Sequence, residues 1–468
     1  MMGDRVRTFP EGFLWGAATA AFQIEGSTSA DGRSDSIWDA LCRRPGAIVG
    51  GHTGEPAADH YRRMPEDVAL MAELGLRSYR FSVSWPRVHP DGGAANPAGL
   101  DFYRRLVDEL LEHGIAPWVT LYHWDLPQVL EDAGGWPARD TAYRFAEYAA
   151  TVADALGDRV PYWTTMNEPF CQALLGYAAG EHAPGRTEPR AAVSAVHHLL
   201  LGHGLAVEAI RSRTDGVPVG VTLNFASIAP LDPADPADIE AARKIDGLQN
   251  RLFLGPVLDG AYPADVAADL EPYGLSGNIR DGDLAVISTP VDLLGVNYYL
   301  GSTVSGHPDP DPPAPSAMDR PAPPASQWVG AEDVSFRGSE RPVTGMEWEI
   351  YPEGLTELLV RLHKQHPGIP LYVTENGAAY PDTVVDGQVH DPGRRDYVAA
   401  HVAAVHDAIE AGADVRGYFV WSLLDNFEWA WGYSQRFGVV HVDFATQRRT
   451  VKSSGHWFAS VAASNAVQ

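Results

Sequence analysis

The segment YWTTMNEP, residues 162–169, is an apolar and β-branched run that stops at Glu168 and is followed at once by proline. A second segment, LYVTENG at 371–377, repeats this arrangement: the run ends at Glu375, and a glycine follows two positions later. Aromatic and β-branched residues favour strands, whereas proline and glycine interrupt them. The two segments therefore predict two strands that each end at a glutamate.

Six further strand-like runs bring the total to eight. The eight runs span residues 13–19, 78–84, 116–122, 162–166, 218–224, 292–299, 370–374 and 415–422. Helix-like stretches lie between them, at 65–74, 100–113, 141–156, 191–211, 352–366 and 395–411. We expect Pro65 to open the first of these helices and Gly75 to close it.

Alternation of strands and helices predicts an α/β fold, a single parallel (β/α)8 barrel that takes up residues 1–468. The strand-like runs are almost continuously apolar, which is typical of strands buried on both faces. A doubly wound dinucleotide-binding sheet is disfavoured, because no Gly-x-Gly-x-x-Gly follows an early strand. A stretch rich in Pro and Asp, about 302–341, is expected to be a loop after the sixth strand. It is either a plain insertion or part of the cleft entrance.

Polar and aromatic residues gather at the carboxyl ends of the predicted strands, the face where a barrel of this kind places its active site. They are Gln23, Trp85, His123, Asn167, Glu168, Asn224, Asn297, Tyr299, Glu375 and Trp421. Neighbouring side chains on a regular strand point to opposite faces. We therefore expect the strand to end or bulge at Asn167 and Glu168 if both contact one ligand.

The two strand-end glutamates suit glycoside hydrolysis. That reaction needs one carboxyl group to protonate the leaving oxygen and a second to act as base or nucleophile at the anomeric carbon. A single glutamate of this kind would be read as an ordinary surface carboxylate. The pair, in matching settings at the ends of the fourth and seventh strands, favours catalysis.

Composition limits the classes of partner. The chain has 468 residues, 45% of them apolar, and a formal net charge of -26. This charge argues against nucleic acid and anionic membranes as partners, and solubility is its simplest explanation. Two cysteines make no disulfide framework, and neither a signal peptide nor an apolar run long enough to span a bilayer is expected. A cytoplasmic protein is predicted, and its oligomeric state, homo-oligomer included, stays open.

At this point the sequence resembles a known family. Residues 13–26, FLWGAATAAFQIEG, resemble the N-terminal signature of glycoside hydrolase family 1. TMNEP at 165–169 and YVTENG at 372–377 resemble its acid/base and nucleophile motifs, and WEIYP at 348–352 and Glu428-Trp429 match as well. The similarity extends from about Phe9 to Phe458. It implies a retaining β-glycosidase on a (β/α)8 barrel, with no cofactor and no metal.

The resemblance also assigns roles. Glu375 would be the nucleophile, Glu168 the acid/base, and Asn167 the residue that holds the sugar 2-hydroxyl. It places Gln23, His123, Glu428 and Trp429 in the glycone pocket, Trp421 on its floor, Asn297 and Tyr299 near the nucleophile, Arg80 beside Glu375, and Trp348 on the aglycone side. A cation and a hydroxyl donor lower a carboxyl pKa, as an anionic nucleophile requires. Glu168 must start protonated and so needs a less polar or more negative setting.

The preferred hypothesis is an exo-acting β-glucosidase that acts on β-glucosides and cello-oligosaccharides, with a role in cellulose and polysaccharide degradation. Fucosides and galactosides, and transglycosylation, stay open. A 6-phospho-β-glycosidase is disfavoured by Glu428 and by the absence of Lys from 428–438. A non-catalytic sugar-binding barrel is disfavoured because both glutamates are present.

Two further features have plain interpretations. His197, His198 and His203 have no accompanying ligand set, and His198 and His203 do not share a helix face, so no metal site is expected. Cys171 lies three residues after Glu168, and we expect it to be buried and inert.

Overall fold

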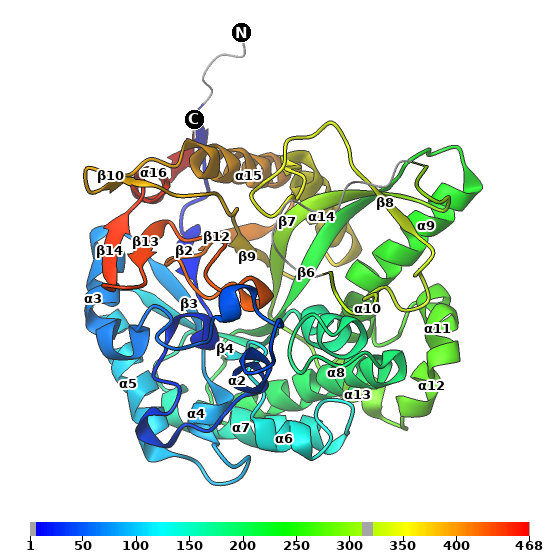
Figure 1. The fold of residues 1–468 in the computed structure, drawn as a ribbon, viewed down its shortest axis with the longest axis horizontal. Helices are drawn as coiled ribbons and strands as arrows, with labels where there is room; N and C mark the ends of the chain where they lie inside the picture. Colours follow the sequence, from blue (N-terminus) through cyan, green and yellow to red (C-terminus); the bar gives the residue numbers. More distant parts are fainter. Residues whose placement is uncertain (1–5, 311–321, 468) are drawn as a thin grey trace.

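The computed structural model describes residues 6–310 and 322–467. Within those residues, eight parallel strands close into a barrel that helices surround (Figure 1). The strands are β2 (Leu14–Ala18), β3 (Ser78–Ser82), β4 (Ala116–Tyr122), β5 (Tyr162–Asn167), β6 (Val219–Pro230), β7 (Leu293–Ser305), β9 (Leu371–Asn376) and β12 (Val415–Trp421). Each strand pairs with the next, and β12 pairs with β2 to close the ring. The predicted (β/α)8 barrel is confirmed.

Side chains fill the barrel interior. Trp118 of β4 packs edge-on against Tyr372 of β9 and Phe419 of β12, with ring centroids 5.0 and 5.2 Å away. All five residues of β3 are buried, including Arg80. Burial on both faces explains why these strands read as continuous apolar runs in the sequence.

The helices around the barrel match the predicted stretches, with shifted ends. They include α3 (His60–Glu73), α5 (Pro97–Glu112), α7 (Asp140–Leu156), α8 (Pro189–Arg211), α14 (Pro352–Gln365) and α15 (Pro392–Glu410). The expectation that Pro65 opens a helix is wrong, because α3 begins at His60 and Pro65 lies inside it. A proline there leaves one intrahelical hydrogen bond unmade, but it does not end the helix. Gly75, at φ +69°, follows the helix end as expected.

Helix α8 corrects the expectation that the chain has no apolar run long enough to span a bilayer. By length and composition alone it is apolar enough to cross a membrane. Most of that apolar stretch is buried, however, and α8 packs along α7. Its composition is therefore that of a core helix.

The segment at 302–341 is partly strand, which differs from the predicted loop. Strands β6 and β7 run on past the barrel rim as a paired ribbon, with Pro230 opposite Val304. Strand β8 (Ser335–Arg337) returns antiparallel on β7 (Figure 1, upper right). Prolines 312, 313 and 321 lie outside the described residues. Gln327, Trp328 and Phe336 of this segment line the cavity described below.

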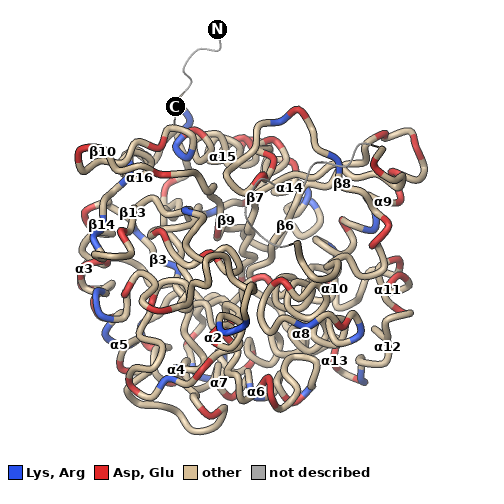
Figure 2. The backbone as a smooth tube through the Cα atoms, viewed as in Figure 1, with Lys and Arg blue, Asp and Glu red and all other residues tan. Residues whose placement is uncertain are grey.

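Acidic and basic residues are both spread along the helices and loops outside the barrel (Figure 2). The acidic excess is distributed over many elements rather than gathered on one. This distribution agrees with the interpretation of the net charge as a solubility feature.

Candidate active site

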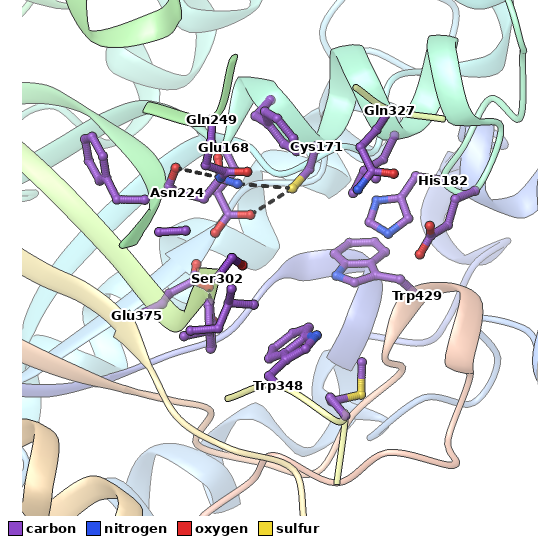
Figure 3. Close-up of a pocket in the computed structure, with 18 of the residues that line it drawn as sticks. Glu168, Cys171, His182, Asn224, Gln249, Ser302, Gln327, Trp348, Glu375 and Trp429 are labelled. Atoms are coloured by element: carbon purple, nitrogen blue, oxygen red, sulfur yellow. Dashed lines mark hydrogen bonds between the residues drawn. The ribbon is translucent and has the colours of Figure 1, made fainter. Parts of the chain in front are cut away.

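A cavity of about 500 Å³ opens at the carboxyl ends of the strands (Figure 3). Eight of the predicted site residues line it: His123, Glu168, Tyr299, Trp348, Glu375, Trp421, Glu428 and Trp429. The other four are buried and hydrogen-bonded to these residues or to their neighbours: Gln23, Arg80, Asn167 and Asn297. The structure therefore brings these twelve residues to one place. Trp85, which the sequence also places at a strand end, does not join them: it is buried against Phe145 and Tyr148, outside the cavity lining.

The backbone at the end of β5 explains how two neighbouring side chains serve one site. β5 ends at Asn167, and its pairing with β6 is irregular between Thr164 and Asn167. Glu168 follows with φ +46°, in the left-handed region that residues other than glycine seldom adopt. Such conformations cluster at functional sites, where the surroundings hold them in place. The expectation that the strand ends here is confirmed.

Glu375, at the end of β9, has both carboxylate oxygens bound. Arg80 donates from Nη1 to Oε1 at 2.5 Å, and the Tyr299 hydroxyl donates to Oε2 at 2.7 Å. Burial raises the pKa of Glu375 above its ordinary value, while Arg80 and Tyr299 oppose the rise. The cation and the hydroxyl are where we expected them, but the net direction of the pKa shift is upward because the carboxyl is fully buried.

Glu168 has a different environment. Asn297 donates from Nδ2 to Oε1 at 2.6 Å, and the Cys171 thiol donates to Oε2 at 3.2 Å. Burial, with the charge of Glu375 as the next cause, raises the pKa of Glu168 to about 8. At neutral pH this carboxyl holds its proton, as a general acid must.

The two carboxyl groups are linked through Asn167 and Asn297. Arg80 donates from Nη2 to Asn167 Oδ1 at 2.6 Å, and Asn297 Nδ2 donates to the same oxygen at 3.1 Å. Asn297 Oδ1 accepts from the Thr374 hydroxyl at 2.8 Å. A cation lies beside Glu375, whereas only neutral amide and thiol donors lie beside Glu168. These surroundings favour the ionised form of Glu375 and the protonated form of Glu168, and glycoside hydrolysis requires one carboxyl group in each form.

Comparison with known proteins agrees with this chemistry. A family model described as glycosyl hydrolase family 1 matches residues 5–467. The chain belongs to this family. It is 51% identical over 464 residues to a thermostable β-glucosidase B of Thermobispora bispora, covering 98% of this chain and 92% of that protein.

Another relative is a bifunctional β-D-glucosidase/β-D-fucosidase of Bifidobacterium breve, 47% identical over 461 residues, with 96% and 97% of the two chains covered. Among solved structures, a psychrophilic β-glucosidase from Micrococcus antarcticus superposes with a TM-score of 0.96 at 56% identity, covering 98% of each chain. A β-glucosidase from Thermotoga maritima in complex with isofagomine lactam gives a TM-score of 0.91 at 44% identity, covering 99% of this chain and 100% of that one.

In this family 1 enzyme, three of the predicted site residues have a buried polar atom without a hydrogen-bond partner among the described residues: Gln23 Oε1, His123 Nδ1 and Glu428 Oε2. His123 and Glu428 line the cavity. Gln23 Nε2 donates to Asn426 Oδ1 and to the Phe427 carbonyl, which fixes the direction of Oε1. Buried polar groups cost free energy unless they are paired. Atoms of this kind suit the hydroxyl groups of a sugar.

Aromatic rings pack around His123. The His123 ring lies 5.8 Å from both Trp421 and Trp429 and is nearly parallel to each. Trp124 packs against Trp429 at 4.5 Å. Burial and the nearby Arg80 charge lower the pKa of His123 well below its ordinary value, so its ring is neutral. Flat rings with a few fixed polar atoms are typical of pockets for neutral ligands.

The cavity is also lined by residues that no sequence motif indicated. Phe170, Trp328 and Phe336 form a row of rings, with centroid distances of 5.7 and 5.2 Å. Trp328 and Phe336 come from the stretch after β7 that the sequence predicts only as a loop. The cavity lining also includes the polar side chains of Asn224, Gln249 and Gln327 (Figure 3). Of these, only Asn224 was indicated by the sequence, through its place near a strand end.

His198, singled out in the sequence with His197 and His203, lies 3.1 Å from the Trp136 carbonyl. His197 lies 3.0 Å from the Tyr262 hydroxyl and 2.9 Å from Asp283, and His203 lies 2.7 Å from the Thr165 hydroxyl. Cys42 and Cys171 are free and buried. Burial raises the pKa of the Cys171 thiol well above its ordinary value, as expected of an inert cysteine. Its hydrogen bond to Glu168 was not foreseen.

The two carboxyl groups predict a bell-shaped dependence of kcat/KM on pH. Glu168 works when protonated, so activity should fall as pH rises through its pKa of about 8. Glu375 works when ionised, so activity should also fall as pH drops through a pKa raised above the ordinary 4.5. Initial rates with nitrophenyl β-glucoside between about pH 4 and about pH 10 measure both limbs. An alkaline limb near the ordinary glutamate value would contradict the assignment of the acid.

Proposed function

We propose that this family 1 enzyme is an exo-acting β-glucosidase that hydrolyses terminal non-reducing β-D-glucosyl residues with retention of configuration. The observation that carries the proposal is the pair of buried carboxyl groups with opposite surroundings. Glu375 is held by a cation and a hydroxyl, and Glu168 is held by an amide and a thiol.

In the first step Glu375 attacks the anomeric carbon and forms an ester with the sugar, while Glu168 gives its proton to the leaving oxygen. The Tyr299 hydroxyl and Arg80 hold the attacking carboxylate in position. Asn167 Nδ2 has a second hydrogen beyond its contact with His123, which can reach the sugar 2-hydroxyl. In the second step the Glu168 carboxylate takes a proton from water, and the resulting hydroxide equivalent attacks the anomeric carbon and releases Glu375.

Several observations support terminal glucose as the substrate unit. His123 and Glu428 line the cavity, and each has a buried polar atom without a hydrogen-bond partner among the described residues, as has the nearby Gln23, which favours a single sugar with several free hydroxyls. A relative from Thermotoga neapolitana, 43% identical over 463 residues, is named 1,4-β-D-glucan glucohydrolase. We therefore propose β-glucosides and short cello-oligosaccharides as substrates, and a place in cellulose breakdown. The bifunctional relative supports fucosides as further substrates.

Replacing each glutamate should produce a distinct phenotype. Glu375→Gly should lose nearly all turnover because no covalent intermediate forms, and azide should restore it partly with the α-glycosyl azide as product. Glu168→Ala should be slowest with poor leaving groups, which need the proton. With dinitrophenyl glucoside its first step should survive, and azide should give the β-glycosyl azide.

Product analysis with azide, together with rates for good and poor leaving groups, distinguishes the two roles. Glu112→Ala, on the exposed end of α5, is the matched control and should behave like the wild type. The opposite pattern, with the β-azide from Glu375→Gly and the α-azide from Glu168→Ala, would exchange the assignments.

A 6-phospho-β-glucosidase is the alternative that the site disfavours. Arg436, the nearest cation in sequence to Glu428, donates from Nη1 to Asp425 Oδ2 at 2.6 Å and to the Val442 carbonyl at 3.0 Å. Arg436 is thus engaged with Asp425 and Val442, and it does not line the cavity. A phosphate would instead meet Glu428, and two unit charges 4 Å apart at an effective dielectric of 20 repel by about 4 kcal/mol.

We therefore expect kcat/KM for nitrophenyl β-glucoside to exceed that for its 6-phosphate by on the order of a thousandfold where Glu428 is ionised. Burial and the two catalytic carboxyls raise the pKa of Glu428 to about 8, so the ratio should grow as pH rises through that value. Glu428→Gln should lower the ratio and flatten its pH dependence. Equal values for the two substrates, or a preference for the phosphate, would show that Glu428 does not face the 6-position.

A further inference from the structure

The acid/base carboxyl is held by two donors of unequal strength. Asn297 Nδ2 donates to Glu168 Oε1 at 2.6 Å. The Cys171 thiol donates to Oε2 at the longer distance of 3.2 Å (Figure 3). The Cys171 amide also donates to the Glu168 carbonyl at 3.0 Å, at the start of η3 (Cys171–Ala179). The thiol is therefore held against Glu168 by the backbone as well as by its own hydrogen bond.

The surroundings of the sulfur direct its hydrogen toward Glu168. Asn224 Nδ2 approaches Cys171 Sγ at 3.9 Å as a donor, and Gln249 Nε2 in turn donates to the Asn224 carbonyl at 3.2 Å. The Asn224 amide thus occupies an acceptor side of the sulfur. The S–H group remains as the donor to Oε2.

This arrangement places the catalytic proton on Oε2. Oε1 already accepts a short hydrogen bond from an amide, so Oε2 is the oxygen that carries the hydrogen of the protonated acid. The group beside it is a thiol, which is both a weak donor and a weak acceptor. A hydroxyl at the same place would bind the carboxylate more strongly and would favour early loss of the proton.

We propose that Cys171 is a positioning residue for the acid/base: its thiol holds Oε2 in place and leaves the catalytic proton available for transfer to the leaving oxygen. The inference rests on the proposed function of Glu168. When Oε2 gives its proton to the glycosidic oxygen, the S–H bond stays intact and donates to the new carboxylate. When Glu168 takes a proton from water in the second step, Oε2–H is restored, and the sulfur has neither lost nor gained a proton.

Other titratable groups also act on Glu168 or Cys171, and the test must separate them from the thiol. They are Glu375 on β9, Arg80 on β3, Tyr299 at the end of the barrel portion of β7, Glu428 after β12, and Glu181 after η3. His123 lies within the same cavity and is kept neutral. A substitution confined to Cys171 leaves all of these side chains in place.

The experiment compares Cys171→Ser and Cys171→Ala, with Cys42→Ala as the matched control. Cys42 is the other buried free cysteine, and it lies on α2 (Ile37–Cys42) outside the cavity lining. Cys171→Ser supplies a stronger donor, so the alkaline limb of kcat/KM should move to lower pH by about one unit, given the strength of hydrogen bonds to charged groups. Cys171→Ala removes a donor, so that limb should move to higher pH.

Cys171→Ala should also lose activity on the order of tenfold with poor leaving groups, and less with dinitrophenyl glucoside. Cys42→Ala should keep both the wild-type pH profile and the wild-type leaving-group dependence. If Cys171 only fills space, its variants lose thermal stability but keep the wild-type alkaline limb, and that result would overturn the proposal.

A measurement on the wild type avoids dependence on variants that fold poorly. The infrared S–H stretch of Cys171 should shift with the same alkaline pKa as activity, because its acceptor changes from acid to carboxylate, while the stretch of Cys42 should stay constant. If neither S–H band shifts with pH, the hydrogen bond between the Cys171 thiol and Glu168 is refuted. The azide products of Glu168→Ala test the role of Glu168 separately. If they do not match the prediction, the proposed function is wrong, whereas an unchanged alkaline limb in the Cys171 variants refutes only the role of the thiol.

Discussion

The active site depends on a cation buried inside the barrel. Arg80 is 1% exposed and binds Glu375 through one nitrogen and Asn167 through the other. Removing one partner of such a buried pair leaves an unpaired charge, which typically costs about 3–5 kcal/mol. Two carboxyl groups that share an enclosed cavity cannot both ionise cheaply. The position of Arg80 decides which of them carries the charge.

The barrel places Arg80 beside Glu375. The parallel strands β3, β5, β7 and β9 all run toward the same face of the barrel, so Arg80, Asn167, Asn297 and Glu375 meet there although they are far apart in the chain. The left-handed backbone at Glu168 then turns the acid/base into the cavity. Asn297 connects the two halves, since it donates to Glu168 and accepts from Thr374, the residue before the nucleophile. A cation on one side and weak, neutral donors on the other keep the pair in different protonation states.

Much of this could be predicted from the sequence, because buried parallel strands and strand-end polar residues leave local patterns. The eight strands, both glutamates and the residues around Glu375 were predictable on that basis. The start of α3 was not, because Pro65 looks like a helix opener although it lies inside the helix. The continuation of β7 to Ser305 was also missed, since its pairing partners on β6 and β8 are distant in sequence. Trp328, Phe336 and the thiol contact of Cys171 depend on tertiary packing alone, which no local pattern records.

The central claim is that Glu375 attacks the sugar directly while Glu168 supplies and then recovers a proton. Proton NMR of nitrophenyl β-glucoside hydrolysis tests it most directly, by following the anomeric signals at early times before mutarotation. Two displacements at one carbon predict that β-glucose appears first and that α-glucose grows in later. Initial release of α-glucose would mean a single displacement by water, and it would contradict the roles of nucleophile for Glu375 and acid/base for Glu168.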